Sequence, residues 1–142
     1  MVALASDSAR LYVLKIGEVS RSEKIVMSTT EIAYQFTAAL KAGKFEEAER
    51  FWSDDVVSYE AQEGPMREVR GREAVHGKGE WWTANHDVHS FETEGPYVNG
   101  DLFALRFKID VTPKATGQRT KMDEIGLYTV KDGKIIEERF FY

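Results

Sequence analysis

The chain has 142 residues, 42% of them hydrophobic, no cysteine and a formal net charge of −5. This balance is typical of one globular domain with one core, which needs neither disulfides nor a structural metal to fold. The lack of cysteine excludes disulfides, zinc–thiolate sites and cysteine nucleophiles, and it favours a cytoplasmic protein. No Lys/Arg-rich run suggests nucleic-acid binding, and no apolar run approaches the ~20 residues of a membrane span.

Residues 1–26 differ from the rest of the chain because they show no clear hydrophobic period. Their one short apolar segment predicts at most a strand at Arg10–Ile16. A basic start, a long apolar middle and a small-residue cleavage site are missing, so a signal peptide is not expected. We interpret residues 1–26 as an N-terminal extension and residues 27–142 as the domain. An upstream start codon chosen in error is the alternative.

Two helices are predicted next. Ser28 and Glu31 have the spacing of a capping box, which satisfies free backbone N–H groups at a helix start. Apolar residues then recur on one helical face as far as Leu40, and Gly43 ends the helix. A second helix follows after a short loop, and its apolar side comprises Phe45, Ala48, Phe51 and Trp52.

A polar turn at 53–55 separates the second helix from the first strand. In this strand Val57 and Tyr59 point to one face, and Ser58 and Glu60 point to the other. Alternation alone favours the Val57–Tyr59 face as the buried one. Glu60 is then a solvated charge at a strand end.

The remaining chain predicts one helix followed by strands. Gly71 starts the helix, which runs to about Ala84. The strands are expected at 88–94, 97–98, 102–112, 121–130 and 134–142. Asp132-Gly133 between the last two is the strongest short-range hairpin signal. The long strand 102–112 carries a single apolar face: Phe103, Leu105, Phe107, Ile109 and Val111. This order predicts an α+β fold in which helices cover one face of a curved sheet.

Three segments resemble SnoaL-like domains of the nuclear transport factor 2-like superfamily. They are QFTAALKAGKFEEAERFWSDDVVSYE, EGPYVNGDLFALRFKIDVT and EIGLYTVKDGKIIEERFFY, and the resemblance spans about residues 30–142. It implies a cone-shaped α+β barrel: three helices on a strongly curved antiparallel sheet around an apolar cavity, in a homodimer. The superfamily includes isomerases, cyclases, epoxide hydrolases and non-enzymatic binders, so the resemblance does not fix one function.

Ketosteroid isomerase has the same cone and uses tuned carboxyl groups. By this resemblance Glu60 falls where that enzyme has its carboxylate base, which places Glu60 on the cavity side. Phe36 falls where it has an oxyanion-hole tyrosine, so that phenol is missing and steroid isomerisation is not expected. Glu124, or Asp123 if the alignment has a one-residue gap, falls near its neutral, proton-donating aspartate.

The surroundings of each carboxyl group decide whether it can act as an acid or a base. An apolar cavity wall raises the pKa of a carboxyl group, which suits Glu60 to the role of general base. Asp123 and Glu124 are adjacent in a strand and point to opposite faces. Parity leaves the choice open, although the closing hairpin favours Glu124, and an ion pair with Arg106 or Arg139 is the structural alternative.

His76 and Glu138 are two further polar candidates. His76 lies four residues before Glu80, so the two can form a surface salt bridge on one helical face, or His76 can shuttle protons at a cavity mouth. Glu138 lies in a mostly apolar row, where it is either buried and paired or facing the cavity. Of Trp81 and Trp82, one is expected to point toward the core. The three histidines lack metal-site spacing, so neither a metal nor a cofactor is expected.

The sequence therefore predicts a cofactor-independent isomerase, cyclase or hydrolase acting on a small apolar or aromatic molecule. Glu60 is the proposed general base, with Glu124 or Asp123 and His76 as candidate partners. The expected ligand contacts are Phe36, Trp52, Trp82, Phe107, Glu138, Phe140 and Tyr142. A non-catalytic binding or sensing domain is the alternative, and an interaction module that dimerises through its outer sheet face is a third.

Overall fold

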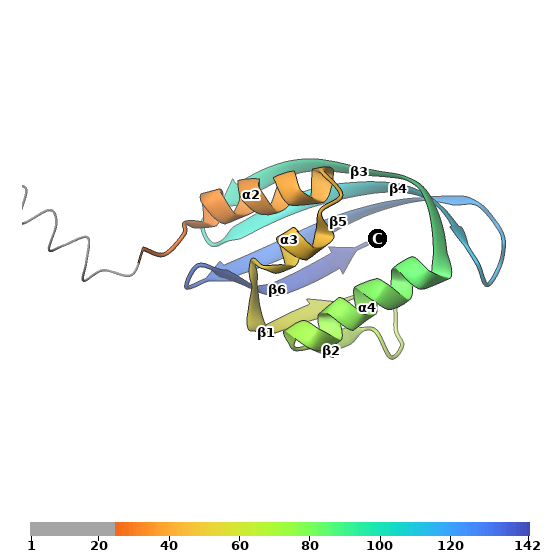
Figure 1. The fold of residues 1–142 in the computed structure, drawn as a ribbon, viewed down its shortest axis with the longest axis horizontal. Helices are drawn as coiled ribbons and strands as arrows, with labels where there is room; N and C mark the ends of the chain where they lie inside the picture. Colours follow the sequence, from red (N-terminus) through yellow and green to blue (C-terminus); the bar gives the residue numbers. More distant parts are fainter. Residues whose placement is uncertain (1–24) are drawn as a thin grey trace, which may run out of the picture.

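The structure, a computed structural model, describes residues 25–142 (Figure 1). The strand predicted at Arg10–Ile16 lies outside the described residues. The helices are α2 (Thr29–Lys41), α3 (Phe45–Glu49) and α4 (Arg72–Asn85). The strands are β1 (Trp52–Tyr59), β2 (Glu68–Arg70), β3 (His86–Asn99), β4 (Leu102–Pro113), β5 (Thr120–Lys131) and β6 (Lys134–Phe141).

The first helix begins and ends as the sequence predicts. Ser28 is the N-cap of α2, and its Oγ accepts a hydrogen bond from the backbone N–H of Glu31 at 3.2 Å. Gly43, with φ +71°, follows the helix in the left-handed region that glycine adopts most easily. None of the helices between residues 25 and 142 is long and apolar enough to cross a membrane.

The six strands form one curled sheet in the order β2-β1-β6-β5-β4-β3. All three helices lie on the same, concave side of it (Figure 1). The strands from β3 to β6 pair antiparallel, whereas β1 runs parallel to β6. The sheet is therefore mixed and not purely antiparallel. The strands β1 and β6 start at the same end of the sheet, where the backbone N–H of Ile135 donates a hydrogen bond to the carbonyl oxygen of Phe51 at 2.8 Å.

The core lies between α2 and the concave face of the sheet. The predicted apolar face of β4 is confirmed, because every second residue from Phe103 to Val111 is buried. Ile32 and Phe36 of α2 pack on this row together with Tyr128 of β5. The hairpin from β5 to β6 is also confirmed: Asp132 and Gly133 have φ values of 50° and 74°, as a two-residue type I′ turn requires.

The second helix is shorter than predicted. It ends at Glu49, so Phe51 and Trp52 do not belong to it, and Trp52 is the first residue of β1. The predicted turn at 53–55 lies inside β1, where the pairing with β6 shifts register between Trp52 and Val57. Because Trp52 pairs with Ile135 of β6, β1 continues through these polar residues.

Two further boundaries differ from the prediction. Gly95-Pro96 does not end a strand, because β3 continues to Asn99 with a register shift between Glu94 and Tyr97. The bulge accommodates the proline within this edge strand. The short strand β2 was not predicted. It pairs only with β1 and closes the other edge of the sheet.

The inner face of β1 is the one that alternation alone did not favour. Ser58 is fully buried, whereas Val57 and Tyr59 are partly exposed on the outer face. Tyr59 is covered there by Arg139, whose guanidinium lies 4.0 Å from the ring centroid. Ser58 tolerates burial because its hydroxyl is hydrogen bonded, which the hydrophobic pattern cannot reveal.

Candidate functional site

Four elements bring polar side chains together on the concave face. In the sheet, Ser58 of β1 lies opposite Glu138 of β6, which lies opposite Tyr128 of β5. Glu124 is four residues before Tyr128 and therefore points to the same face. The helix α4 lies over β1 and supplies Lys78 (Figure 1). We call Ser58, Glu60, Lys78, Glu124 and Glu138 the carboxylate cluster.

Lys78 is the cation of this cluster. Its Nζ lies 2.6 Å from Glu60 Oε1 and donates a hydrogen bond to Ser58 Oγ at 2.6 Å. Its side chain is only 12% exposed, and Nζ lies 5.3 Å from the centroid of the Phe140 ring. Lys78 shares a helical face with buried Val75 and half-buried Trp82, which explains why it points toward the sheet.

Glu138 is the most deeply buried carboxyl group of the cluster, with 5% exposure. Ser58 Oγ donates a hydrogen bond to its Oε1 at 2.8 Å. Burial raises the pKa of Glu138 to about 7, although the Ser58 hydrogen bond and the charge of Lys78 act against this shift. A carboxyl group at this position is therefore partly protonated near neutral pH.

Glu124 has a raised pKa as well, and it is more accessible. Its side chain is half-buried on the inner face of β5. Burial raises its pKa to about 7, the negative charges of Glu60 and Glu138 add to the rise, and Lys78 opposes it. Glu124 thus combines partial access with a pKa in the range of an acid–base group at neutral pH.

Glu60 lies in more polar surroundings than the sequence led us to expect. Besides Lys78, its carboxylate accepts a hydrogen bond from the Tyr142 hydroxyl at 3.2 Å. The backbone N–H of Gln62 donates to the same phenol oxygen at 3.4 Å. Glu60 is consequently held in place by two donors, and its negative charge acts on Glu124.

Asp123 lies on the opposite face of β5. Arg106 binds its two carboxylate oxygens at 2.9 and 2.6 Å, and this bidentate pair lowers the pKa of Asp123. The structural ion pair considered as an alternative is therefore formed, and it involves Asp123. Of the two adjacent carboxylates, Glu124 is the one that the fold brings to the cluster.

His76 is located apart from the cluster. Its Nε2 lies 3.0 Å from Glu80, the predicted partner, and its Nδ1 lies 2.7 Å from Glu49, which the sequence did not suggest. The hydrogen bond that His76 donates to the Glu49 carboxylate contributes most to raising the pKa of His76. The geometry thus connects α3 to α4 through His76 and does not bring it to Glu60 or Glu124.

The predicted aromatic contacts fall into two groups. Phe36, Trp52 and Phe107 are buried core residues. Trp82 and Phe140 are partly buried at the edge of the core, and Trp82 is the inward member of the tryptophan pair, because Trp81 is 50% exposed. Only this second group and Tyr142, which is 50% exposed, offer surface to a molecule near the cluster.

Sequence reasoning did not identify Lys78 or Ser58. Lys78 is not among the predicted site residues, and Ser58 is predicted only as a member of a strand face. One signal was present: Lys78 is three residues after Val75 and four before Trp82, which places it on the apolar face of α4. A lysine on such a face indicates a buried carboxylate partner, because an unpaired charge there is costly.

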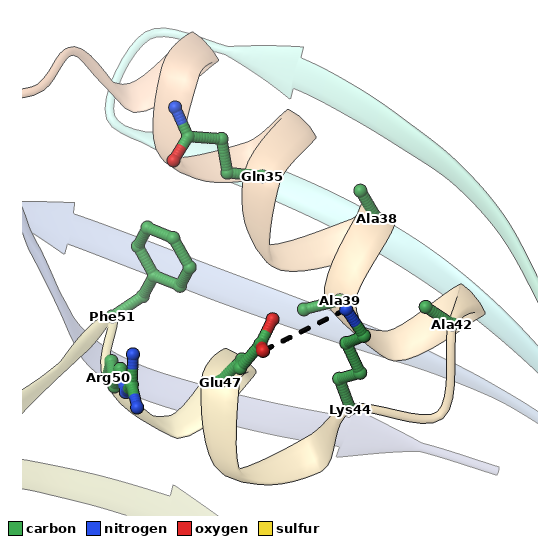
Figure 2. Close-up of a pocket in the computed structure, with 8 residues that line it drawn as sticks. All are labelled: Gln35, Ala38, Ala39, Ala42, Lys44, Glu47, Arg50 and Phe51. Carbon is green, nitrogen blue, oxygen red and sulfur yellow. Dashed lines mark ion pairs between the residues drawn. The ribbon is translucent and has the colours of Figure 1, made fainter.

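A pocket of about 400 Å³ lies elsewhere, between α2 and α3 (Figure 2). It is lined by Gln35, Ala38, Ala39, Ala42, Lys44, Glu47, Arg50 and Phe51. Lys44 and Glu47, both at the start of α3, form an exposed ion pair at 3.9 Å on one wall of the pocket. No member of the carboxylate cluster lines this pocket, so the two features are separate.

The histidines of residues 25–142 make no metal-like arrangement, and no group of three or more potential ligands in that range could hold an ion. His86 stacks on Trp82 with 4.4 Å between the ring centroids. His89 lies 2.7 Å from the hydroxyl of Thr112. Both have structural partners of their own.

The fold is that of the α+β cones of the nuclear transport factor 2-like class, with a carboxylate cluster on the concave face of the sheet. The profile of the SnoaL-like domain matches residues 27–142, and the chain belongs to this family.

A solved SnoaL-like structure from Mesorhizobium loti, named as a candidate polyketide cyclase, is 60% identical to this chain. The match covers 82% of this chain and 100% of that one, with a TM-score of 0.79. A candidate isomerase from Bacillus subtilis (20% identity, 80% and 88% coverage, TM-score 0.64) shares the fold. A protein of the nuclear transport factor 2-like class from Burkholderia xenovorans also shares the fold (19% identity, 80% and 87% coverage, TM-score 0.64). None of the curated proteins matches the chain.

Proposed function

We propose that this domain binds a small apolar organic molecule against the concave face of its sheet. There it catalyses a proton transfer without a cofactor, as isomerases and cyclases do. The observation that carries this proposal is the gathering of three carboxyl groups on one face of the sheet, with Lys78 bound to one of them and Glu124 half-buried with its pKa near 7. The name of the Mesorhizobium loti relative supports the same class of reaction.

The proposed step needs only the carboxyl groups. Ionised Glu124 takes a proton from a carbon next to a carbonyl group, and the electron pair of the C–H bond moves toward the carbonyl oxygen. Protonated Glu124 then returns the proton to the same or another carbon. Glu60, held by Lys78 and Tyr142, keeps a negative charge nearby that strengthens Glu124 as a base.

Proton exchange on a model ketone tests this step. The ketone 2-tetralone is apolar and has acidic C–H groups, and its exchange in D₂O can be followed by proton NMR. We expect the wild-type protein to accelerate exchange above the buffer rate and Glu124→Gln to lose roughly 100-fold or more of that acceleration.

The matched control is Asp123→Asn, the neighbouring carboxylate on the outer face, which should exchange the ketone at the wild-type rate. Equal losses in both variants would mean that exchange does not take place at the carboxylate cluster.

A non-catalytic binding domain is the second candidate. It is favoured by Lys78, which already neutralises one carboxylate, and by the phenylalanine at position 36. The exchange assay separates the two candidates. A wild-type protein that binds 2-tetralone in a fluorescence titration and leaves its exchange at the buffer rate is a binder and not an enzyme.

We further propose that the partner of the domain is a second copy of this chain, docked on the outer sheet face. Four large apolar side chains are 39–65% exposed there: Tyr97, Leu102, Ile125 and Phe141. Ile125 and Phe141 lie opposite each other on β5 and β6. The ion pairs of Arg106 with Asp123 and of Arg139 with Glu137 place both signs of charge beside them, so the face can be complementary to itself.

Light scattering should therefore give a mass of twice 16.2 kDa for the wild-type protein. Ile125→Glu puts a charge into the proposed interface and should give a monomer. The control, Tyr34→Glu, changes an exposed aromatic residue on α2 and should remain dimeric. A monomeric wild type, or a dimeric Ile125→Glu, would contradict the proposed interface.

A further inference from the structure

Tyr128 is a buried phenol that the proposed proton transfer does not use. Its residue is 2% exposed, and its ring stacks on Phe103 with 4.8 Å between centroids. Phe36 and Phe140 pack edge-on against it, with centroid distances of 5.0 and 6.4 Å. Three aromatic neighbours therefore fix the ring and determine where its hydroxyl lies.

The hydroxyl is directed along the inner face of β5 toward Glu124. A Cβ at Gly126, the residue between them on this face, would lie 3.0 Å from both the Tyr128 oxygen and its Cε2 atom. The same Cβ would lie 3.1 Å from Phe107. Gly126 thus leaves the space that the phenol occupies, and no side chain separates the hydroxyl from Glu124 along the strand.

The hydroxyl has no hydrogen-bond partner among residues 25–142. Its pKa is shifted only by burial and by the charges of neighbouring carboxylates, with no contribution from a hydrogen bond. In this part of the chain, two buried side-chain polar atoms lack a hydrogen-bond partner: Trp52 Nε1 and Thr93 Oγ1. The Tyr128 oxygen is not among them, so it keeps a small exposed surface although its residue is 2% exposed. A nearly buried hydroxyl without a partner is rare unless a ligand or water completes it.

The protonation state of the Tyr128 phenol also suits it to bind a ligand. Burial raises the pKa of Tyr128 well above its ordinary value, and the charges of Glu138, Glu124 and Glu60 add to this rise. The phenol therefore keeps its proton, and its O–H group is available to donate a hydrogen bond to an acceptor oxygen.

We infer that Tyr128 donates a hydrogen bond to an oxygen atom of the molecule bound beside Glu124. The ligand class is thereby narrowed to apolar molecules with a carbonyl or similar acceptor oxygen next to the carbon that exchanges its proton. This inference rests on the proposed function and adds a specificity-determining group to the same site.

Two probes of equal shape test the donor. The ketone 2-tetralone has an acceptor oxygen, whereas 2-methylenetetralin has a CH₂ group in its place. We expect the wild-type protein to bind the ketone about three- to tenfold more tightly than the alkene, as one net hydrogen bond allows. Tyr128→Phe should lose this preference and keep its affinity for the alkene. The carbonyl stretch of the bound ketone should also move to higher frequency in this variant.

Three variants make the result specific. Tyr59→Phe removes a phenol from the outer face and should keep the ketone preference. Gly126→Ala keeps the Tyr128 hydroxyl and displaces it, so the preference should fall although the phenol is present. A ketone preference that survives in Tyr128→Phe, or that disappears in Tyr142→Phe instead, overturns the role of Tyr128.

Failure of this inference differs from failure of the proposed function. If Tyr128→Phe keeps the preference while Glu124→Gln abolishes exchange, Tyr128 is only a core residue and the proton transfer stands. If the wild-type protein binds neither probe, both the site and the Tyr128 donor are contradicted. A purely structural role of Tyr128 would change thermal stability without changing the ratio of the two affinities.

Discussion

Replacing Lys78 by methionine is expected to destabilise the domain by about 2–3 kcal/mol at pH 8. Methionine keeps the packing of the stem and removes the ammonium group. Glu60 then loses the ion pair at 2.6 Å, and Ser58 loses a donor. Both partners are largely buried, so water replaces the lost contacts poorly, and the remaining carboxylates repel one another without a counter-charge.

The loss should be smaller at pH 5.5, because the carboxyl groups can then become neutral by binding protons. Lys44→Met is the matched control: its pair with Glu47 spans 3.9 Å, and both side chains are more than half exposed. Its removal should change stability by less than about 0.5 kcal/mol. Urea unfolding at the two pH values measures all of these effects. A Lys78→Met loss no larger than that of Lys44→Met would mean that Lys78 is not the counter-charge of the cluster.

Raising the pH from 5 to 8 is expected to destabilise the wild-type domain. Glu124 and Glu138 have folded-state pKa values of about 7, whereas glutamate in an unfolded chain has a pKa near ~4.3. Between these values the folded state binds more protons than the unfolded state, so stability falls as the pH rises. Each group contributes on the order of 2 kcal/mol to this fall.

Glu138→Gln isolates one of the two contributions. Glutamine keeps an acceptor for Ser58 and cannot ionise, so this variant should be more stable than the wild type at pH 8 and similar to it at pH 5. His76 has a raised pKa and adds a fall of the same sign, which cancels in the comparison between variants. Glu137→Gln, a neighbour paired with Arg139, should keep the wild-type slope. A Glu138→Gln protein that is less stable than the wild type at pH 8 would show that the ionised Glu138 carboxylate stabilises the fold, which would contradict its raised pKa.

The sequence predicted the fold well because its main signals are local. The capping box at Ser28, the alternating row from Phe103 to Val111 and the Asp132-Gly133 turn each depend on neighbouring residues. The predicted strand boundaries were wrong where pairing with a distant strand outweighed the local sequence pattern. Pairing of Trp52 with Ile135 drew a polar segment into β1, and a bulge carried β3 past Pro96.

The site was harder to predict because its members come from four elements. Glu60 and Glu124 were named from a resemblance, and hydrophobic alternation alone placed Glu60 on the outer face. Alternation failed at β1 because Ser58 is buried by hydrogen bonds and not by hydrophobicity. Lys78 came to the cluster through the packing of α4 over β1, which no local pattern in the sheet could indicate.

A pH titration of Glu124 by carbon NMR, with its carboxyl signal assigned by comparison with Glu124→Gln, measures whether this carboxyl group exchanges protons near neutral pH. We expect a midpoint about 2–3 units above the ~4.3 of a free glutamate. We also expect a lower midpoint in Glu60→Gln, because a neighbouring negative charge is lost, and a higher midpoint in Lys78→Met, because a neighbouring positive charge is lost. A midpoint near ~4.3 that neither variant moves would contradict a coupled, proton-exchanging carboxylate cluster.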